Sequence, residues 1–172
     1  MGKLARLLDF VDFGEICRGC QVNCCRRFYA ILLDEEVEEF KAVAKPIKTR
    51  YGIVHTLGDP HGGVCPYLRS DGLCNVYPKR PFDCRFWPLM IHYDSTSGEF
   101  VIHLDMECPA AREGRIPKEL LDRMLKTVLN AGLDENWVKR FTSTPWHGNL
   151  KEIARVKSLS KGENVRLQAP KP

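Results

Sequence analysis

Residues 84–108 read CRFWPLMIHYDSTSGEFVIHLDMEC and predict a β-hairpin over about residues 89–106. Apolar and polar residues alternate on both sides of the turn sequence STSG at 95–98, as they do in half-buried strands. A shift of one residue would destroy the apolar face of this hairpin, so its register is well specified. The register pairs Leu89 with Leu104, Ile91 with Ile102 and Tyr93 with Phe100.

The same hairpin places other residues with useful chemistry. Cys84 and Cys108 come to its open end, where we expect them to serve one site. His92 and His103 fall on the face opposite to the apolar pairs, because successive side chains of a strand point to opposite sides. We expect both histidines to face solvent.

Helical patterns follow the hairpin. Residues 117–131 begin with a proline and carry one apolar stripe, and Gly132 ends the predicted helix. A shorter helix is expected around Trp137, and residues 151–157 suit a third. Residues 160–172 contain few apolar residues and two prolines, so we expect a frayed tail.

Upstream of the hairpin, residues 34–46 predict another helix. Asp34 suits its N-terminus, Phe40 belongs to its buried face, and Pro46 would end it. Residues 52–64 hold four glycines and a proline, which predicts a loop.

The predicted fold class is therefore α+β: a small, loop-rich domain organised by cysteine metal sites, with one hairpin and C-terminal helices. We expect residues 1–116 to form the metal-binding domain and residues 117–159 a helical extension packed on it, with 160–172 as the tail.

The chain has 172 residues, and its eight cysteines are a high number for a protein without an export signal. Its N-terminus lacks the pattern of a signal peptide or lipid anchor, and no apolar run is long enough to cross a membrane, so we expect a cytoplasmic protein. Disulfides do not persist in a reducing cytosol, and metal ligation is the favoured use of the cysteines. Buried thiols, or disulfides of the kind found in hyperthermophilic cells, are the alternative.

The spacing of the cysteines supports metal ligation. CxxC at 17–20 is a spacing at which a turn directs two thiolates to one ion, and residues 69–72 predict a turn between two later cysteines. On an extended backbone the neighbours Cys24 and Cys25 would point apart, which suits two different centres, or one ligand and one buried thiol. Eight thiols fit two tetrahedral sites, and the spacing leaves their division open. The predicted ligands are Cys17, Cys20, Cys24, Cys25, Cys65, Cys74, Cys84 and Cys108.

Five stretches of the chain resemble the YkgJ-type cysteine-cluster family of zinc- or iron-chelating domains. They are CRGCQVNCCR at 17–26, ILLDEEV at 31–37, CPYLRSDGLCNVY at 65–77, RPFDCRFWP at 80–88 and CP at 108–109. The usual family pattern has two residues before the vicinal cysteines and this chain has three, a spacing similar to the branch related to flagellin lysine methylases. The resemblance implies metal binding by the eight cysteines and leaves the reaction, if any, open.

For the cofactor we favour an iron–sulfur cluster, with zinc as the alternative. Two four-cysteine centres would each carry about −2, so the formal net charge of +4 would fall to about zero. Nucleic acid is therefore not indicated as a partner, and neither is a membrane. The predicted partners are metal ions, with an unknown protein partner possible. A structural, redox or metal-handling role is favoured over a methylase-type enzyme or a metal-folded module for a protein or RNA partner.

Catalytic motifs are not recognised, and no glycine-rich nucleotide loop is present. We therefore lean towards a protein that is not an enzyme. His55, Asp59 and His61 are candidate extra ligands, although such residues more often stabilise turns. Four arginines flank the cysteines and could donate hydrogen bonds to thiolates, attract anions or form a solvated rim; they are Arg26, Arg27, Arg80 and Arg85. The three tryptophans, Trp87, Trp137 and Trp146, are expected to be packing residues.

Overall fold

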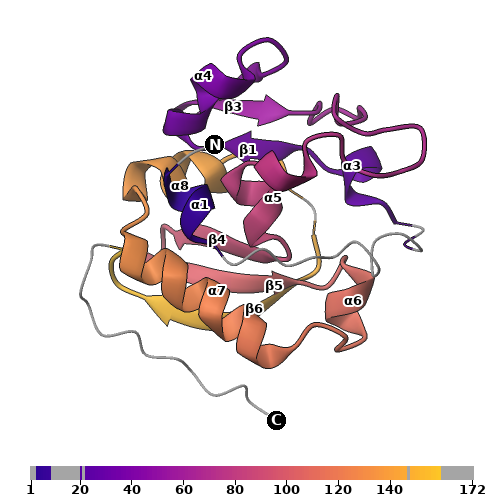
Figure 1. Cartoon of the computed structure of the whole chain (residues 1–172). Coiled ribbons are helices and arrows are strands. Elements are labelled where there is room, and N and C mark those ends of the chain that lie inside the picture. Colours follow the sequence, from indigo (N-terminus) through magenta and orange to yellow (C-terminus); the bar gives the residue numbers. More distant parts are fainter. Residues whose placement is uncertain (1–2, 9–19, 21, 147, 160–172) are drawn as a thin grey trace.

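The computed structural model describes residues 3–8, 20, 22–146 and 148–159 (Figure 1). The helices are α1 (Lys3–Leu7), α3 (Cys24–Arg27), α4 (Val37–Phe40), α5 (Phe82–Phe86), α6 (Pro109–Arg112), α7 (Lys118–Ala131) and α8 (Glu135–Thr142), with 3-10 turns η1 (Asp34–Glu36) and η2 (Tyr77–Lys79). The strands are β1 (Ala30–Leu32), β2 (Lys45–Thr49), β3 (Gly52–Leu57), β4 (Leu89–Asp94), β5 (Glu99–Asp105) and β6 (Leu150–Val156). The fold is α+β, as predicted.

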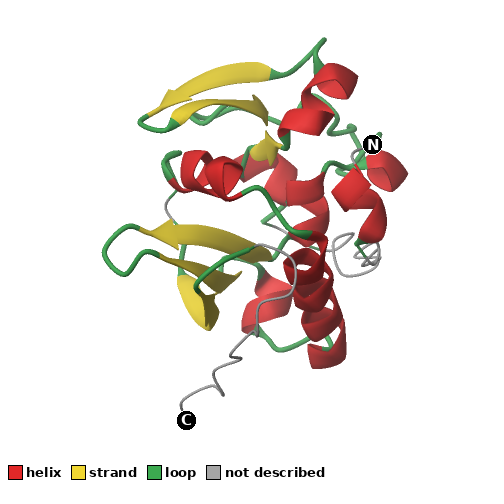
Figure 2. Cartoon of the chain, turned by 90° about the vertical axis from the view of Figure 1, so that its left-hand side faces the viewer, coloured by secondary structure: helices red, strands yellow, loops and turns green. Residues whose placement is uncertain are grey.

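The strands form two antiparallel sheets of three strands, with the orders β1-β3-β2 and β4-β5-β6. The two sheets lie on opposite sides of the molecule, and helices lie between them (Figure 2). Both α5 and α8 contact both sheets: α5 packs on β1 and β4, and α8 packs on β3 and β4. These two helices therefore connect the halves of the molecule.

The β4–β5 hairpin has the predicted register, with Leu89 opposite Leu104 and Ile91 opposite Ile102. The prediction of a helix at 151–157 was wrong, because β6 occupies this segment and pairs with β5. Pairing with β6 satisfies the open edge of β5, and it buries Ala154 completely. The backbone N–H and C=O groups of β5 need hydrogen-bond partners, and this requirement has more influence on the segment than the helical spacing of its apolar residues.

The predictions for the first sheet need correction. Residues 52–64 are not a loop throughout, since β3 is the central strand of the sheet. The predicted helix at 34–46 is shorter: it begins as η1 and ends at Phe40. Pro46 then lies in β2, an edge strand, where the missing N–H of proline is tolerated. The buried face survives, because Phe40 packs in a small cluster with Leu32 and Leu57.

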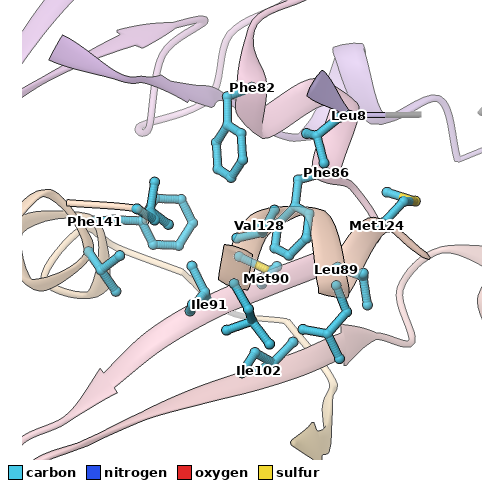
Figure 3. Packing of buried hydrophobic residues seen from close by; sticks show 14 of the residues in the cluster. Leu8, Phe82, Phe86, Leu89, Met90, Ile91, Ile102, Met124, Val128 and Phe141 are labelled. Atoms are coloured by element: carbon cyan, nitrogen blue, oxygen red, sulfur yellow. The ribbon is translucent and has the colours of Figure 1, made fainter. Parts of the chain in front are cut away.

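The main apolar core lies between the second sheet and α5, α7 and α8 (Figure 3). Phe82 and Phe86 of α5 stack with their ring centroids 5.3 Å apart above this sheet. Helix α7 contributes its predicted stripe, including Met124 and Val128, and Gly132 follows it with a φ of 73° that favours glycine. The second predicted helix is confirmed as α8, whose Trp137 is 1% exposed.

His92 and His103 do not face open solvent, contrary to the prediction. Helix α8 covers this face of the hairpin, and the His92 ring lies 5.6 Å from the Phe141 ring and 5.1 Å from the His103 ring. Burial lowers the pKa of His92 to about 4, and the charge of His103 adds to that effect. Burial also lowers the pKa of His103. The hairpin is thus covered on both faces.

None of the described helices has the length and apolar character needed to cross a lipid bilayer. Residues 160–172, predicted as a tail, lie outside the described residues.

Candidate metal centre

Seven cysteines from distant parts of the chain line one cavity of about 170 Å³. Cys20 precedes α3, and the other six come from the start of α3, the loop between β3 and η2, helix α5 and the residue before α6. The cysteines that line it are Cys20, Cys24, Cys25, Cys65, Cys74, Cys84 and Cys108. All seven are free thiols. Cys17 lies outside the described residues.

The vicinal cysteines lie in a helix rather than on an extended backbone, which corrects the prediction. Cys24 and Cys25 are the first two residues of α3, where consecutive side chains are rotated by about 100°. Asn23, within the longer spacer of this chain, precedes them with a positive φ of 41°. Its side chain donates a hydrogen bond to the Gly72 carbonyl at 3.0 Å. The spacer therefore ties the first cysteine segment to the turn between Cys65 and Cys74.

The segment from Cys65 to Cys74 folds back on itself. Leu68 and Cys74 form an antiparallel bridge, and the predicted turn at 69–72 closes with a hydrogen bond from the Gly72 N–H to the Arg69 carbonyl at 3.0 Å. The Cys65 N–H donates to the Cys25 carbonyl at 2.8 Å, which joins this segment to α3. Backbone hydrogen bonds thus bring three cysteines together.

Cys84 is positioned by α5, and two acidic side chains attach this helix to the first sheet. The Glu36 carboxylate, which is 0% exposed, accepts hydrogen bonds from the N–H groups of Leu33 at 3.0 Å and Phe82 at 2.8 Å. The Asp83 carboxylate accepts the N–H of Ile31 at 2.8 Å. Burial raises the pKa of each acid to about 7. Sequence analysis did not single out either residue.

Two of the flanking arginines organise the backbone around Cys84. Arg85 is 6% exposed and donates to the Arg80 carbonyl at 2.9 Å and to the Pro78 carbonyl. Arg80 lines the cavity, donates to the Cys84 carbonyl at 3.3 Å and stacks on the Tyr77 ring at 4.0 Å. These two arginines are not a solvated rim.

The thiols interact electrostatically. The Cys25 thiol and the Cys65 sulfur share a hydrogen bond, which raises the pKa of Cys25 and lowers that of Cys65. Burial raises the pKa of Cys74, and Arg80 opposes this effect. Burial also raises the pKa of Cys84, with a contribution from the neighbouring charge of Asp83. Metal ions favour the thiolate and would relieve the cost of holding buried thiolates together.

The candidate extra ligands lie elsewhere. Within the described part of the chain, the cavity lining does not include His55, Asp59 or His61. His55 lies in β3 opposite Leu32. Asp59 pairs with Lys45 at 3.0 Å and accepts the His61 N–H at 3.0 Å, which is a turn-stabilising role.

An aromatic group lines the remainder of the cavity. The Phe28 ring centroid lies 4.9 Å from that of Trp146 and 5.3 Å from that of Trp87. The Trp87 Nε1–H is buried and has no hydrogen-bond partner among the described residues. Only the three-dimensional fold could reveal this group, since Phe28 and Trp146 are far apart in the sequence.

The donor set fits a thiolate-bound metal. Thiolates are the usual ligands of structural zinc and of iron–sulfur clusters. Among the described residues, no three histidine, cysteine or acidic side chains are drawn together tightly enough to hold a single ion as they stand. The thiols surround a wider space instead.

These features define a cysteine-based metal-binding domain. Residues 16–109, more than half of the chain, match the CxxCxxCC family model, described as "Putative zinc- or iron-chelating domain". The chain therefore belongs to this family, in agreement with the resemblance noted in the sequence. No curated protein and no solved structure matches the chain.

Proposed function

We propose that this protein binds iron as an iron–sulfur cluster through its cysteines, with a redox, structural or metal-handling role. The carrying observation is that all seven described cysteines line a single cavity. The free state of these thiols suits a reducing compartment such as the cytoplasm. The eighth ligand, Cys17, is proposed from the sequence alone.

The spacing of the described cysteines favours a cluster over single zinc ions. Four thiolates bind zinc at Zn–S distances of about 2.3 Å, which requires them to lie close together. Among the described residues, no three cysteine, histidine or acidic side chains are that close. An iron–sulfur cluster brings inorganic sulfide of its own and is held by cysteines that lie farther apart.

The residues around the cavity would support a bound cluster in distinct ways. The cysteines supply thiolates, Arg80 supplies positive charge beside Cys84, and the apolar lining limits the access of water. When bound, an iron–sulfur cluster supplies one-electron redox chemistry, and such surroundings set its reduction potential.

Metal and sulfide analysis of anaerobically purified protein tests this proposal. We expect iron together with acid-labile sulfide, and a broad visible absorption that bleaches on reduction. Zinc without acid-labile sulfide would show that the protein binds zinc and not an iron–sulfur cluster. Protein with neither metal after reconstitution would refute metal binding altogether.

A methylase-type enzyme is a second candidate, favoured by the aromatic group beside the thiols. Phe28, Trp87 and Trp146 offer apolar surface on which an organic molecule could bind next to the metal. Equilibrium binding of S-adenosylmethionine to the metal-loaded protein tests it. Micromolar binding that is lost on metal removal would favour the enzyme, and its absence would favour the non-enzymatic role.

A further inference from the structure

Asp105, the last residue of β5, is a buried acid that holds the segment leading to Cys108. It is 0% exposed, and its own N–H donates to the Pro88 carbonyl at 2.9 Å. Its carbonyl accepts the Cys108 N–H at 3.3 Å, and its carboxylate Oδ1 accepts the Glu107 N–H at 2.8 Å. These contacts shape the turn that carries Cys108 into the cavity lining.

The second carboxylate oxygen of Asp105 faces an indole N–H. Oδ2 of Asp105 and Nε1 of Trp146 are both buried, and neither makes a hydrogen bond of ordinary geometry with the described residues. Gly148 shows that the two atoms share one place, because a Cβ at this position would lie 2.6 Å from Oδ2 and 2.3 Å from Nε1. An acceptor and a donor therefore meet beside a backbone that carries no side chain.

The ring of Trp146 belongs to the wall of the thiol cavity. Its centroid lies 4.9 Å from that of Phe28 and 5.9 Å from that of Trp87. The ring thus packs on the aromatic group of the cavity, while its N–H edge lies next to Asp105. A contact that fixes this edge also fixes the orientation of the ring over the cavity.

Pairing of the two atoms is favoured by the cost of leaving them apart. A buried donor or acceptor without a partner costs free energy, and nearly all such groups in folded proteins are paired. A carboxylate can serve both N–H groups, because Oδ1 accepts from Glu107 and leaves Oδ2 for Trp146. Asparagine has a single acceptor oxygen and cannot serve both at full strength.

We propose, resting on the metal centre proposed above, that Asp105 is a positioning residue of that centre. Its Oδ1 sets the turn that carries Cys108, and its Oδ2 accepts the Trp146 N–H and holds the indole as a cover over the thiols. A glycine is needed at position 148, since a side chain there would separate the pair. Through these contacts a buried carboxylate outside the cavity lining limits the access of water and small chelators to the metal.

The indole N–H resonances of the ¹⁵N-labelled protein test the pairing directly. The chain has three tryptophans, so Trp146→Phe identifies the resonance of Trp146. We expect this resonance to move, and its N–H to exchange faster with water, in Asp105→Asn and in Gly148→Ala. The glycine variant leaves both groups in place and changes no charge. An unmoved resonance in both variants would overturn the pairing.

Glu107→Gln is the matched control for the loss of negative charge near the cavity. It removes a carboxylate two residues away whose side chain is 32% exposed, and it keeps both oxygens of Asp105. The Trp146 resonance should keep its position in this variant. A displacement as large as that in Asp105→Asn would show that charge alone moves it, and would overturn the positioning role.

The rate at which a chelator removes iron from the loaded proteins tests the consequence for the centre. We expect Asp105→Asn and Gly148→Ala to bind iron and to lose it about tenfold faster than the wild type, because one hydrogen bond to a charged group no longer opposes opening of the cover. Glu107→Gln should stay close to the wild-type rate, since an exposed charge contributes little.

Wild-type rates in both Asp105→Asn and Gly148→Ala would overturn the proposal while metal binding stands. A wild-type protein that holds no metal after reconstitution would instead refute the proposed function, and the indole resonances of the metal-free protein would still decide whether Asp105 and Trp146 are paired.

Discussion

The cysteine region and the apolar core differ in how they are held together. The cysteine region, defined here as residues 20, 22–29 and 62–80, contains one short helix, a 3-10 turn, loops and an isolated bridge, and its described cysteines are only partly buried. The apolar core of β4, β5 and α7 has long elements whose central side chains, such as Ile102 and Met124, are 0% exposed. Burial of apolar surface stabilises the core, whereas the cysteine region lacks enough of it and depends on ligands that join its loops.

Metal removal should show the largest difference between the two regions. Metal binding to a structural site contributes folding free energy directly, so its loss should open the loops that carry the thiols. We expect backbone amides of the cysteine region to lose most of their protection from hydrogen exchange, while those of α7 keep theirs. Exchange followed by mass spectrometry on loaded and metal-free protein measures this. Equal loss of protection in both regions would mean that the core also depends on the metal.

A cavity in the core should have the opposite effect. Met124→Ala removes a fully buried side chain and should lower the free energy of unfolding by about 2–5 kcal/mol, with metal content unchanged. Lys126→Ala, on the exposed side of the same helix, is the matched control and should stay within about 0.5 kcal/mol of the wild type. Chemical denaturation of the loaded proteins measures both. A loss of metal in the Met124 variant would show that the two regions are not separable.

The histidine pair under α8 should make the stability of the core sensitive to acid. The pKa of His92 is about 4 in the folded protein against an ordinary 6.5, so the unfolded chain binds more protons between these values. The stabilising contribution of neutral His92 is complete above pH 6.5 and is lost as the pH falls towards 4, by up to about 3 kcal/mol.

The difference in unfolding free energy between wild type and His92→Gln, followed from pH 7 to 4, isolates this effect. The variant should lose less stability than the wild type on acidification, because glutamine does not titrate. Parallel curves for the two proteins would show that His92 is not buried as a neutral group.

The smallest effect is expected at the Asn23 contact within the cysteine region. Asn23→Gly keeps the positive φ of this position and removes only the hydrogen bond to Gly72, which should cost about 1 kcal/mol in the loaded protein. Asn23→Ala also strains the backbone and should cost about 1–2 kcal/mol more. Thermal melting of the two variants compares these effects. Equal stability of both variants would contradict the strained conformation at Asn23.

Sequence reasoning worked best where the period of apolar residues is strong. The alternation around Leu89 and Ile102 predicted the hairpin with its register, and the stripe through Met124 predicted α7. Sequence reasoning failed where pairing with distant segments of the chain determines the structure. In β3, the strand-forming residues Ile53, Val54 and Thr56 are flanked by glycines that suggest a loop.

For the site, the cysteine spacing predicted candidates but not their neighbours. Cys25 and Cys65 meet through a backbone contact that no local pattern contains. The role of the buried Glu36 could not be predicted from its neighbours, because it depends on the Phe82 N–H, 46 residues later. Such long-range contacts are set by the tertiary fold.

X-ray absorption at the iron and zinc edges of the purified, unoxidised protein tests the central claim most directly, because it reports the atoms around the metal. The account predicts a first shell of sulfur ligands only, followed by an iron–iron shell from a cluster. A first shell dominated by nitrogen or oxygen would contradict it, since it would mean that the thiols lining the cavity are not the ligands.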